Sequence, residues 1–210
     1  MTRTTNLLMI SGFSVMFALV SASAEADAAI YVKIPGIEGD VTTEGYDNGE
    51  WFVADSFSFG VEREMKESVG KGGTQDINIG IGELQDVSIS KSMDSASAQL
   101  AQLAINGNSC GTAEIDFVEI EESSGEAVPY LKYKLDRCFV KSWSISGDAD
   151  DRPTEEVAFY YNKIAFAYTP QGEEKPKPTN IMSWDNVKNI PWDTVFDPIR
   201  DLIFPQEKSK

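Results

Sequence analysis

The residues of this chain that could carry chemistry are two cysteines and a large excess of carboxylates. The sequence has no histidine, and 34 Asp+Glu stand against 18 Lys+Arg in 210 residues, for a formal charge of −16. Histidine is the commonest general base and the commonest metal ligand in proteins. Its absence excludes Ser–His–Asp and Cys–His nucleophile sites and the HExxH zinc site. Only a carboxylate, lysine or tyrosine mechanism remains.

The carboxylates form no motif that is typical of a site. Glu155 and Glu156 could in principle serve a glycosidase, but adjacent pairs arise by chance in so acidic a chain. Asp148, Asp150 and Asp151 lack the further ligands, the central glycine and the final glutamate of an EF-hand loop. We therefore expect no catalytic residue, no metal ligand and no cofactor.

Composition and charge limit the class of protein. At 41% hydrophobic and 25% charged, the chain is typical of globular proteins, and its length fits one domain or a small pair. The negative charge argues against nucleic acid or an anionic membrane as the main partner, since both are polyanions.

The first 28 residues have the features of an export signal. Arg3 gives a short positive region, and residues 7–20 form an apolar run of 14, which is too short for a comfortable membrane span. Two overlapping Ala-x-Ala patterns follow, and we favour cleavage after Ala28. The mature chain then has 182 residues and a net charge of −15, with no stable membrane insertion. The alternative is an uncleaved anchor.

The mature chain is predicted to be mostly β. Alternating apolar residues indicate strands in which one face is buried. In 51–61 the predicted apolar face holds Trp51, Val53, Phe57, Phe59 and Val61. The strands that we expect are 31–34, 51–61, 84–92, 112–120, 130–140, 139–146 and 157–168, the last with a bulge near residue 162. Seven or eight strands are best protected in a closed barrel or a tight sandwich.

One helix is expected between residues 94 and 107. Asp94 can cap it, and Gly107 fits the position that ends a helix in the left-handed conformation. Apolar residues recur at helical spacing between these two and predict a face that docks on the barrel. They are Ala96, Leu100, Leu103 and Ala104.

Charges predict the register of one hairpin. If strands 112–120 and 130–140 pair antiparallel about Ser124, Glu114 faces Lys134 and Asp116 faces Lys132. Both are opposite-charge cross-strand pairs, and the apolar residues then share the other face. A slip of one residue would place every apolar residue on the wrong face.

The same register places Cys110 opposite Cys138, on the charged face of the hairpin. Opposed antiparallel residues have Cα atoms about 4.5–5.5 Å apart, within the reach of a disulfide. A Cys110–Cys138 disulfide would suit an exported chain. The alternative is two free thiols, because a bulge could break the register before Cys110.

Residues 62–82 are predicted to form a long connection. The segment contains Gly70, Gly72 and Gly73, and the only strand pattern in it is a weak one that begins at Ile77. Connections of this length in a compact domain are usually functional or mobile.

Five segments in this order resemble the haemolysin-coregulated protein (Hcp) family, whose members form the tube of type VI secretion. Residues 31–39 are similar to the opening of the family, 56–61 to its second signature and 93–100 to the start of its helix. Residues 144–171 carry the strongest resemblance, and 184–189 resemble the family's tail.

The resemblance implies an all-β fold with one helix: a closed barrel of two packed antiparallel sheets. It also implies a homohexameric ring with a wide channel, and stacked rings that carry effector cargo and meet a spike protein. The long connection matches the family's extended loop, which contacts the neighbouring ring. The positions we assign to that contact are Glu62, Lys66, Gly70, Gly72, Gly73 and Ile77.

Three features depart from the family pattern. They are the export signal, the cysteine pair and residues 193–210, which run past the family's end. We expect a signal peptide in 1–28, a barrel domain in 29–172, and a linker and tail in 173–210, family-like to about 192. Asp197-Pro198 in the tail could start a short amphipathic helix, packed on its own barrel or on a neighbour.

Three functions remain in view. The first is an exported Hcp-like structural protein, periplasmic or extracellular, that assembles into rings or tubes. The second is a monomeric binding module of the envelope or the extracellular space with the same fold. The third, a carboxylate-based hydrolase, would require a buried carboxylate pair in a cleft.

Overall fold

The computed structural model of the chain describes residues 28–67, 77–120, 127–170 and 180–192. These residues form twelve strands and one helix. The elements are β1 (Ala28–Lys33), β2 (Trp51–Ala54), β3 (Ser56–Ser58), β4 (Val61–Glu67), β5 (Ile77–Leu84), β6 (Val87–Ser92), α1 (Ser97–Asn106), β7 (Ser109–Ile120), β8 (Ala127–Ser146), β9 (Thr154–Tyr160), β10 (Lys163–Tyr168), β11 (Asn180–Asp185) and β12 (Ile190–Pro191).

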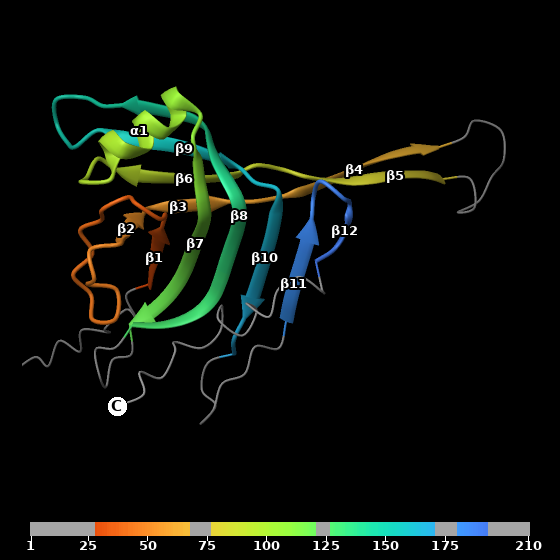
Figure 1. Ribbon diagram of the computed structural model, residues 1–210, viewed down its shortest axis with the longest axis horizontal. Helices are drawn as coiled ribbons and strands as arrows, with labels where there is room; N and C mark the ends of the chain where they lie inside the picture. Colours follow the sequence, from red (N-terminus) through yellow and green to blue (C-terminus); the bar gives the residue numbers. More distant parts are fainter. Residues whose placement is uncertain (1–27, 68–76, 121–126, 171–179, 193–210) are drawn as a thin grey trace, which may run out of the picture.

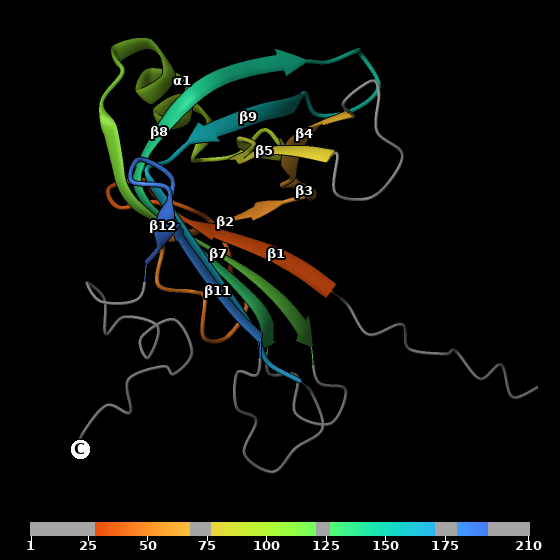
Figure 2. The same ribbon diagram turned by 90° about the vertical axis from the view of Figure 1, so that its right-hand side faces the viewer.

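Antiparallel strands close into a barrel. β1 lies between β7 and β2, and β2 leads directly into β3, which pairs with β6. β6 pairs with β9, and β9 pairs with the second half of β8. The 20-residue β8 closes the barrel because its first half pairs with β7. Figures 1 and 2 show β8 curving from one layer of the barrel into the other. The predicted class, an all-β barrel of two packed antiparallel sheets with one helix, is confirmed.

A wing of three strands extends from the barrel. β10 pairs with the first half of β8, β11 with β10, and β12 with β11 (Figure 1). The sequence patterns predicted no strand beyond residue 168, so β11 and β12 were not expected. The expected strand 157–168 is two strands, because the chain leaves the β6–β9 layer at Asn162 and enters the wing.

The expected strand 51–61 is also divided. At Asp55 the chain changes partner from β1 to β6, and the Asp55 N–H donates to the Ser90 carbonyl at 2.8 Å. The predicted face is therefore wrong for Val53, which is 40% exposed, while Phe52 and Ala54 are buried; Trp51 is buried as predicted. A change of partner in the middle of an alternating run is invisible to periodicity.

Helix α1 covers one end of the barrel as predicted. Ala96 and Leu100 are fully buried, and Leu103 and Ala104 pack against the same core. The predicted cap is wrong: the helix starts at Ser97, and Ala96 is its N-cap with no side-chain capping bond. Asp94 Oδ1 instead accepts from the Ala96 N–H at 2.9 Å, before the helix. Gly107, with φ of 67°, ends it in the left-handed conformation.

The β7–β8 hairpin has the register that the charges predict. Glu114 pairs with Lys134 and Asp116 with Lys132, while Ala113 and Ile115 face the core. This register extends from residue 113 to 117, and the pairing shifts on either side of it.

Candidate functional site: a projecting hairpin and the wing beside it

The most distinctive surface is the β4–β5 hairpin, which projects from the barrel as a separate two-stranded sheet (Figure 1). Its pairing extends from Val61 opposite Leu84 to Glu67 opposite Ile77. The weak strand expected from Ile77 is present as β5, but residues 62–67, expected as part of a loop, form the second strand of the ribbon. β4 was missed because charged residues alternate with Val61 and Met65.

A close backbone approach accounts for one glycine of the hairpin. The register shifts between Arg63 and Met65, where β4 contains a bulge. A Cβ atom on Gly80 would lie 2.9 Å from the Glu64 carbonyl oxygen, closer than real Cβ atoms come to other atoms. Gly80 therefore lets the two backbones approach at the bulge.

The structure places half of the predicted inter-ring residues. Glu62 and Lys66 lie on β4 with exposed side chains, and Ile77 is the first residue of β5. Lys66 pairs with Glu64 at 2.9 Å, but both side chains are about 70% exposed, so the pair adds little stability. The three remaining positions, Gly70, Gly72 and Gly73, lie outside the described residues.

The hairpin carries large apolar side chains that its own barrel does not cover. Val61 is 57%, Met65 66% and Ile81 68% exposed. The wing adds Val187 at 65% and Ile190 at 49%. Single exposed apolar residues need no explanation, but a group of them on neighbouring elements is typical of an interaction surface.

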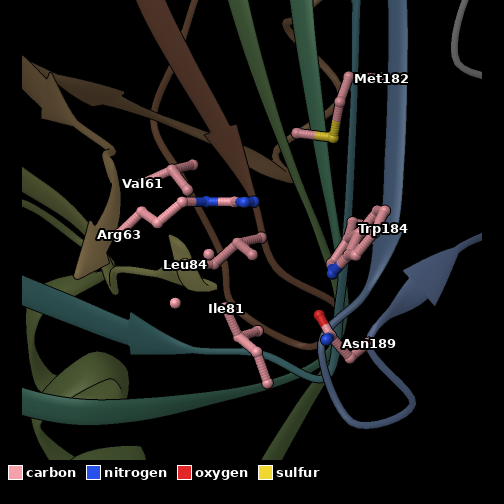
Figure 3. A pocket seen from close by; sticks show the side chains of 9 residues that line it. Val61, Arg63, Ile81, Leu84, Met182, Trp184 and Asn189 are labelled. Atoms are coloured by element: carbon pink, nitrogen blue, oxygen red, sulfur yellow. The ribbon is translucent and has the colours of Figure 1, made fainter. Parts of the chain in front are cut away.

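A pocket of about 470 Å³ lies where the hairpin meets the wing (Figure 3). Val61, Ile81 and Leu84 of the hairpin face Met182 and Trp184 of β11 across it. We call this pocket the hairpin–wing groove. The complete lining is Val61, Arg63, Gly80, Ile81, Gly82, Leu84, Met182, Trp184 and Asn189.

The groove is mostly apolar, with two polar features. The Arg63 side chain extends into it from β4 (Figure 3). The indole N–H of Trp184 is buried, and it has no hydrogen-bond acceptor among the residues that the structure describes. A buried donor without an acceptor costs free energy.

A tight turn positions the groove's far wall. The buried carboxylate of Asp185 accepts hydrogen bonds from the N–H groups of Val187 (3.1 Å) and Lys188 (2.9 Å). Asn189 follows with φ of 56°, a conformation that asparagine tolerates better than most residues. The turn returns the chain beside β11 as β12.

Buried charges elsewhere anchor elements. Lys91 is fully buried, and its Nζ lies 2.6 Å from Asp94 Oδ1 and 3.4 Å from Glu155 Oε2. It therefore joins β6, the start of α1 and β9. Glu156, the neighbour that could form a glycosidase pair, is exposed on the other face of β9. The buried Glu155 faces a lysine, an arrangement that serves structure better than acid–base chemistry.

A second buried group holds the loop between β1 and β2. The Tyr46 hydroxyl donates to Asp116 Oδ2 at 2.9 Å, and Lys132 Nζ lies 3.0 Å from the same oxygen. Burial raises the pKa of Asp116, with Lys132 and Tyr46 opposing the rise. Burial, with the charge of Asp116, also raises the pKa of Tyr46.

The cysteines are placed differently from the prediction. Gly111 rather than Cys110 pairs with Cys138, because the register shifts on both sides of Gly111. Gly111 (φ 71°) and Arg137 (φ 51°) adopt the left-handed conformation there. Both cysteines are buried in the core instead of lying on the charged face.

The two thiols are free in the structure, and they share a side-chain hydrogen bond. This hydrogen bond lowers the pKa of Cys110 and raises that of Cys138. The bulge therefore breaks the expected direct opposition, yet it brings the sulfur atoms together. The disulfide itself stays a prediction.

Two further findings concern the described part of the chain. Its Cys, Asp and Glu side chains form no group of three or more that could hold a metal ion. Within the same ranges, no helix has the length and the apolar character to cross a membrane.

Comparisons with known proteins agree with this geometry. A family model described as "Type VI secretion system effector, Hcp" matches residues 31–168. A comparison with curated protein sequences gives no significant match. Among solved structures, one described as a type six secretion system protein has 24% identity and a TM-score of 0.66, and the match covers 78% of this chain and 99% of that one.

Two more structures from named organisms share the fold. Hcp1 from Salmonella typhimurium has 19% identity and a TM-score of 0.59, with 80% of this chain and 99% of that chain covered. A type VI secretion system effector from Yersinia pestis has 17% identity and a TM-score of 0.51, with 74% and 98% covered.

Proposed function

The chain belongs to the Hcp family of type VI secretion system effectors, and on this premise we propose that it works as a structural subunit which assembles into rings outside the cytoplasm. The family is one of structural tube proteins and not of enzymes. The observation that carries the proposal is the match of the family model to residues 31–168, which contain the projecting hairpin and all of the barrel except the first three residues of β1.

Two surface features support self-assembly. The hairpin exposes Met65, the wing exposes Val187 and Ile190, and the wing ends in the short strand β12 (Figure 1). Apolar side chains on a projecting ribbon and an open sheet edge are both suited to contact with further copies. In the proposed assembly the ring has six copies, the hairpin contacts the next ring, and the channel carries effector cargo toward a spike protein.

Charge opposes such an assembly. A ring of six mature subunits, each with a net charge of −15, would carry about −90. Apolar contacts must offset this repulsion, since like charges destabilise a compact assembly. Met65, Val187 and Ile190, which are exposed and lie outside the hairpin–wing groove, can supply them.

Export is the second part of the proposal. We infer that residues 1–28 are a signal peptide, with 29–172 as the barrel domain and 173–210 as linker and tail. The mature protein then occupies the periplasm or the extracellular space. N-terminal sequencing of the native protein, with its cell fraction, tests this part: Ala29 as the first residue supports cleavage, and an intact Met1 contradicts it.

The cysteine pair fits an exported protein. We infer that Cys110 and Cys138 form a disulfide after export, because both thiols are buried at the same bulge and each shifts the pKa of the other. Both thiol protons are released, and two electrons pass to a thiol–disulfide oxidant in the compartment to which the protein is exported. The S–S bond would join β7 to β8 at the bulge, where backbone pairing is interrupted.

Native mass spectrometry of the mature protein at micromolar concentration tests the ring. A species of six times the subunit mass supports the proposal. A monomer at micromolar concentration contradicts the proposal and favours a binding module of the same fold. The variant Met65→Glu places a charge on an exposed hairpin position outside the hairpin–wing groove and should reduce assembly. The matched control is Ile105→Glu, at an 86% exposed position at the end of α1.

A further inference from the structure

We propose that residues 193–210 fold back onto their own subunit and cover the hairpin–wing groove. This inference goes beyond the proposed function, because it applies to a single chain whether or not rings form. It identifies the groove as an intramolecular docking site and the C-terminal segment as its occupant.

The first argument is the place where the described chain ends. β12 pairs with β11, so that Pro191 lies opposite Trp184. The N–H of Trp192, the last described residue, donates to the carbonyl of Ser183 at 3.4 Å. Ser183 stands between Met182 and Trp184, which both line the groove. The segment therefore starts beside the groove, and its local concentration there is high.

The second argument is length. Eighteen residues follow Trp192. An extended chain spans at most about 3.3–3.6 Å per residue, so a segment of this length reaches some 60 Å. A turn and a short helix over the groove need only part of that reach.

The third argument is the match of surfaces. The groove presents Val61, Ile81, Leu84, Met182 and Trp184, and its volume of about 470 Å³ suits several apolar side chains. The segment carries apolar residues in two groups. They are Val195 and Phe196, and then Ile199, Leu202, Ile203 and Phe204.

The fourth argument is polar complementarity. No carboxylate among the described residues pairs with Arg63, which extends into the groove. The segment contains Asp193, Asp197 and Asp201. A carboxylate for Arg63 is what this segment offers.

Amide hydrogen exchange of the mature protein tests the proposal. We compare the full chain with a chain truncated after Trp192, each over a dilution series. Truncation should accelerate exchange at residues 80–84 and 181–185 by at least about tenfold. Residues 113–118, in the β7–β8 hairpin, should not change. A synthetic peptide of sequence 193–210, added to the truncated chain, should restore the protection.

A point variant keeps the test independent of the truncated chain's folding. In the full chain, Ile81→Arg should give the same local acceleration, and Ile105→Arg is the matched control at an exposed position away from the groove. If neither truncation nor Ile81→Arg changes exchange in the groove, the proposal is overturned. If protection in the full chain disappears on dilution, a second copy covers the groove, and the proposal is equally overturned.

Discussion

Lys91 and Glu155 form an ion pair in which both side chains are fully buried, with Nζ 3.4 Å from Oε2. They come from β6 and β9, two strands of the barrel wall, and Asp94 at the start of α1 joins them at 2.6 Å from the ammonium. One lysine therefore pairs with two carboxylates and connects the helix to the barrel. The second Glu155 oxygen, Oε1, has no partner among the described residues, so the group is only partly satisfied.

Removing the lysine should destabilise the barrel strongly. Lys91→Met leaves the Glu155 carboxylate buried without its cation, and breaking such a pair typically costs about 3–5 kcal/mol. Chemical denaturation at neutral pH measures the loss. The double variant Lys91→Met, Glu155→Leu should recover part of the stability, because no buried carboxylate then remains on β9.

Lys33→Met is the matched control for that variant. Lys33 pairs with Glu50, but the two side chains are 28% and 54% exposed. An exposed pair adds little stability, so Lys33→Met should lose much less than Lys91→Met. Equal losses for the two lysine variants would contradict the role given to burial.

The buried Asp116 should make stability depend on pH. Burial raises its pKa above the ordinary value of 3.8. At pH values between the ordinary pKa and the raised pKa of Asp116, the folded state binds more protons than the unfolded state. The stability that Asp116 contributes therefore falls as pH rises through its folded pKa. Asp116→Asn removes this dependence. Wild-type stability relative to the variant should therefore be greatest at low pH and should decline toward neutral pH in urea denaturation.

Glu50 gives a control of opposite sign. Its hydrogen bond to Lys33 lowers its pKa. The stability that it contributes is present above the unfolded pKa and is lost as pH falls through the folded one. Glu50→Gln should therefore show the reverse trend, with a small amplitude because the group is exposed. The same trend in both variants would overturn the assignment for Asp116.

A glycine near the start of the barrel should not tolerate a side chain. A Cβ atom on Gly39 would lie 1.9 Å from the carbonyl oxygen of Trp51, and backbone atoms cannot yield to it cheaply. Gly39→Ala should cost more than about 2 kcal/mol in unfolding free energy. Gly60→Ala is the control, since its nearest neighbour is a flexible side-chain atom of Gln85 at 3.8 Å. Thermal unfolding of both variants decides the point.

The disulfide can be counted directly. We expect no reactive thiol in the denatured, unreduced mature protein, and two after reduction. Two thiols before reduction would exclude the bond. Loss of a disulfide that closes a loop of this length costs about 3–4 kcal/mol. The double variant Cys110→Ser, Cys138→Ser should be less stable than the oxidised protein by that amount. Its free energy of unfolding should differ much less from that of the reduced protein.

Salt should strengthen the ring. At about −15 per subunit, repulsion between copies is the main electrostatic term, and added salt screens it. Sedimentation velocity at about 0.05 M and about 0.5 M sodium chloride should show a larger fraction of assembled protein at the higher concentration. If the ring dissociates as salt is added, ion pairs rather than apolar contacts hold it together.

The sequence by itself determined the features that depend on neighbouring residues or on one strand pair. Alternation identified the main barrel strands, and the apolar stripe with Gly107 identified α1. The pairs Glu114–Lys134 and Asp116–Lys132 predicted the hairpin register, because a slip of one residue would have turned the core face outward. Residue patterns along the chain also indicated the family that the family model confirms.

Only the tertiary structure decided where strands change partner and what this brings together. The bulge at Gly111 moves Cys138 out of direct opposition and turns both cysteines inward. The break at Asp55 exposes Val53, and the curve of β8 closes the barrel. The groove between β5 and β11 joins segments about a hundred residues apart. Such features arise from long-range pairing, which the periodicity of a single segment does not encode.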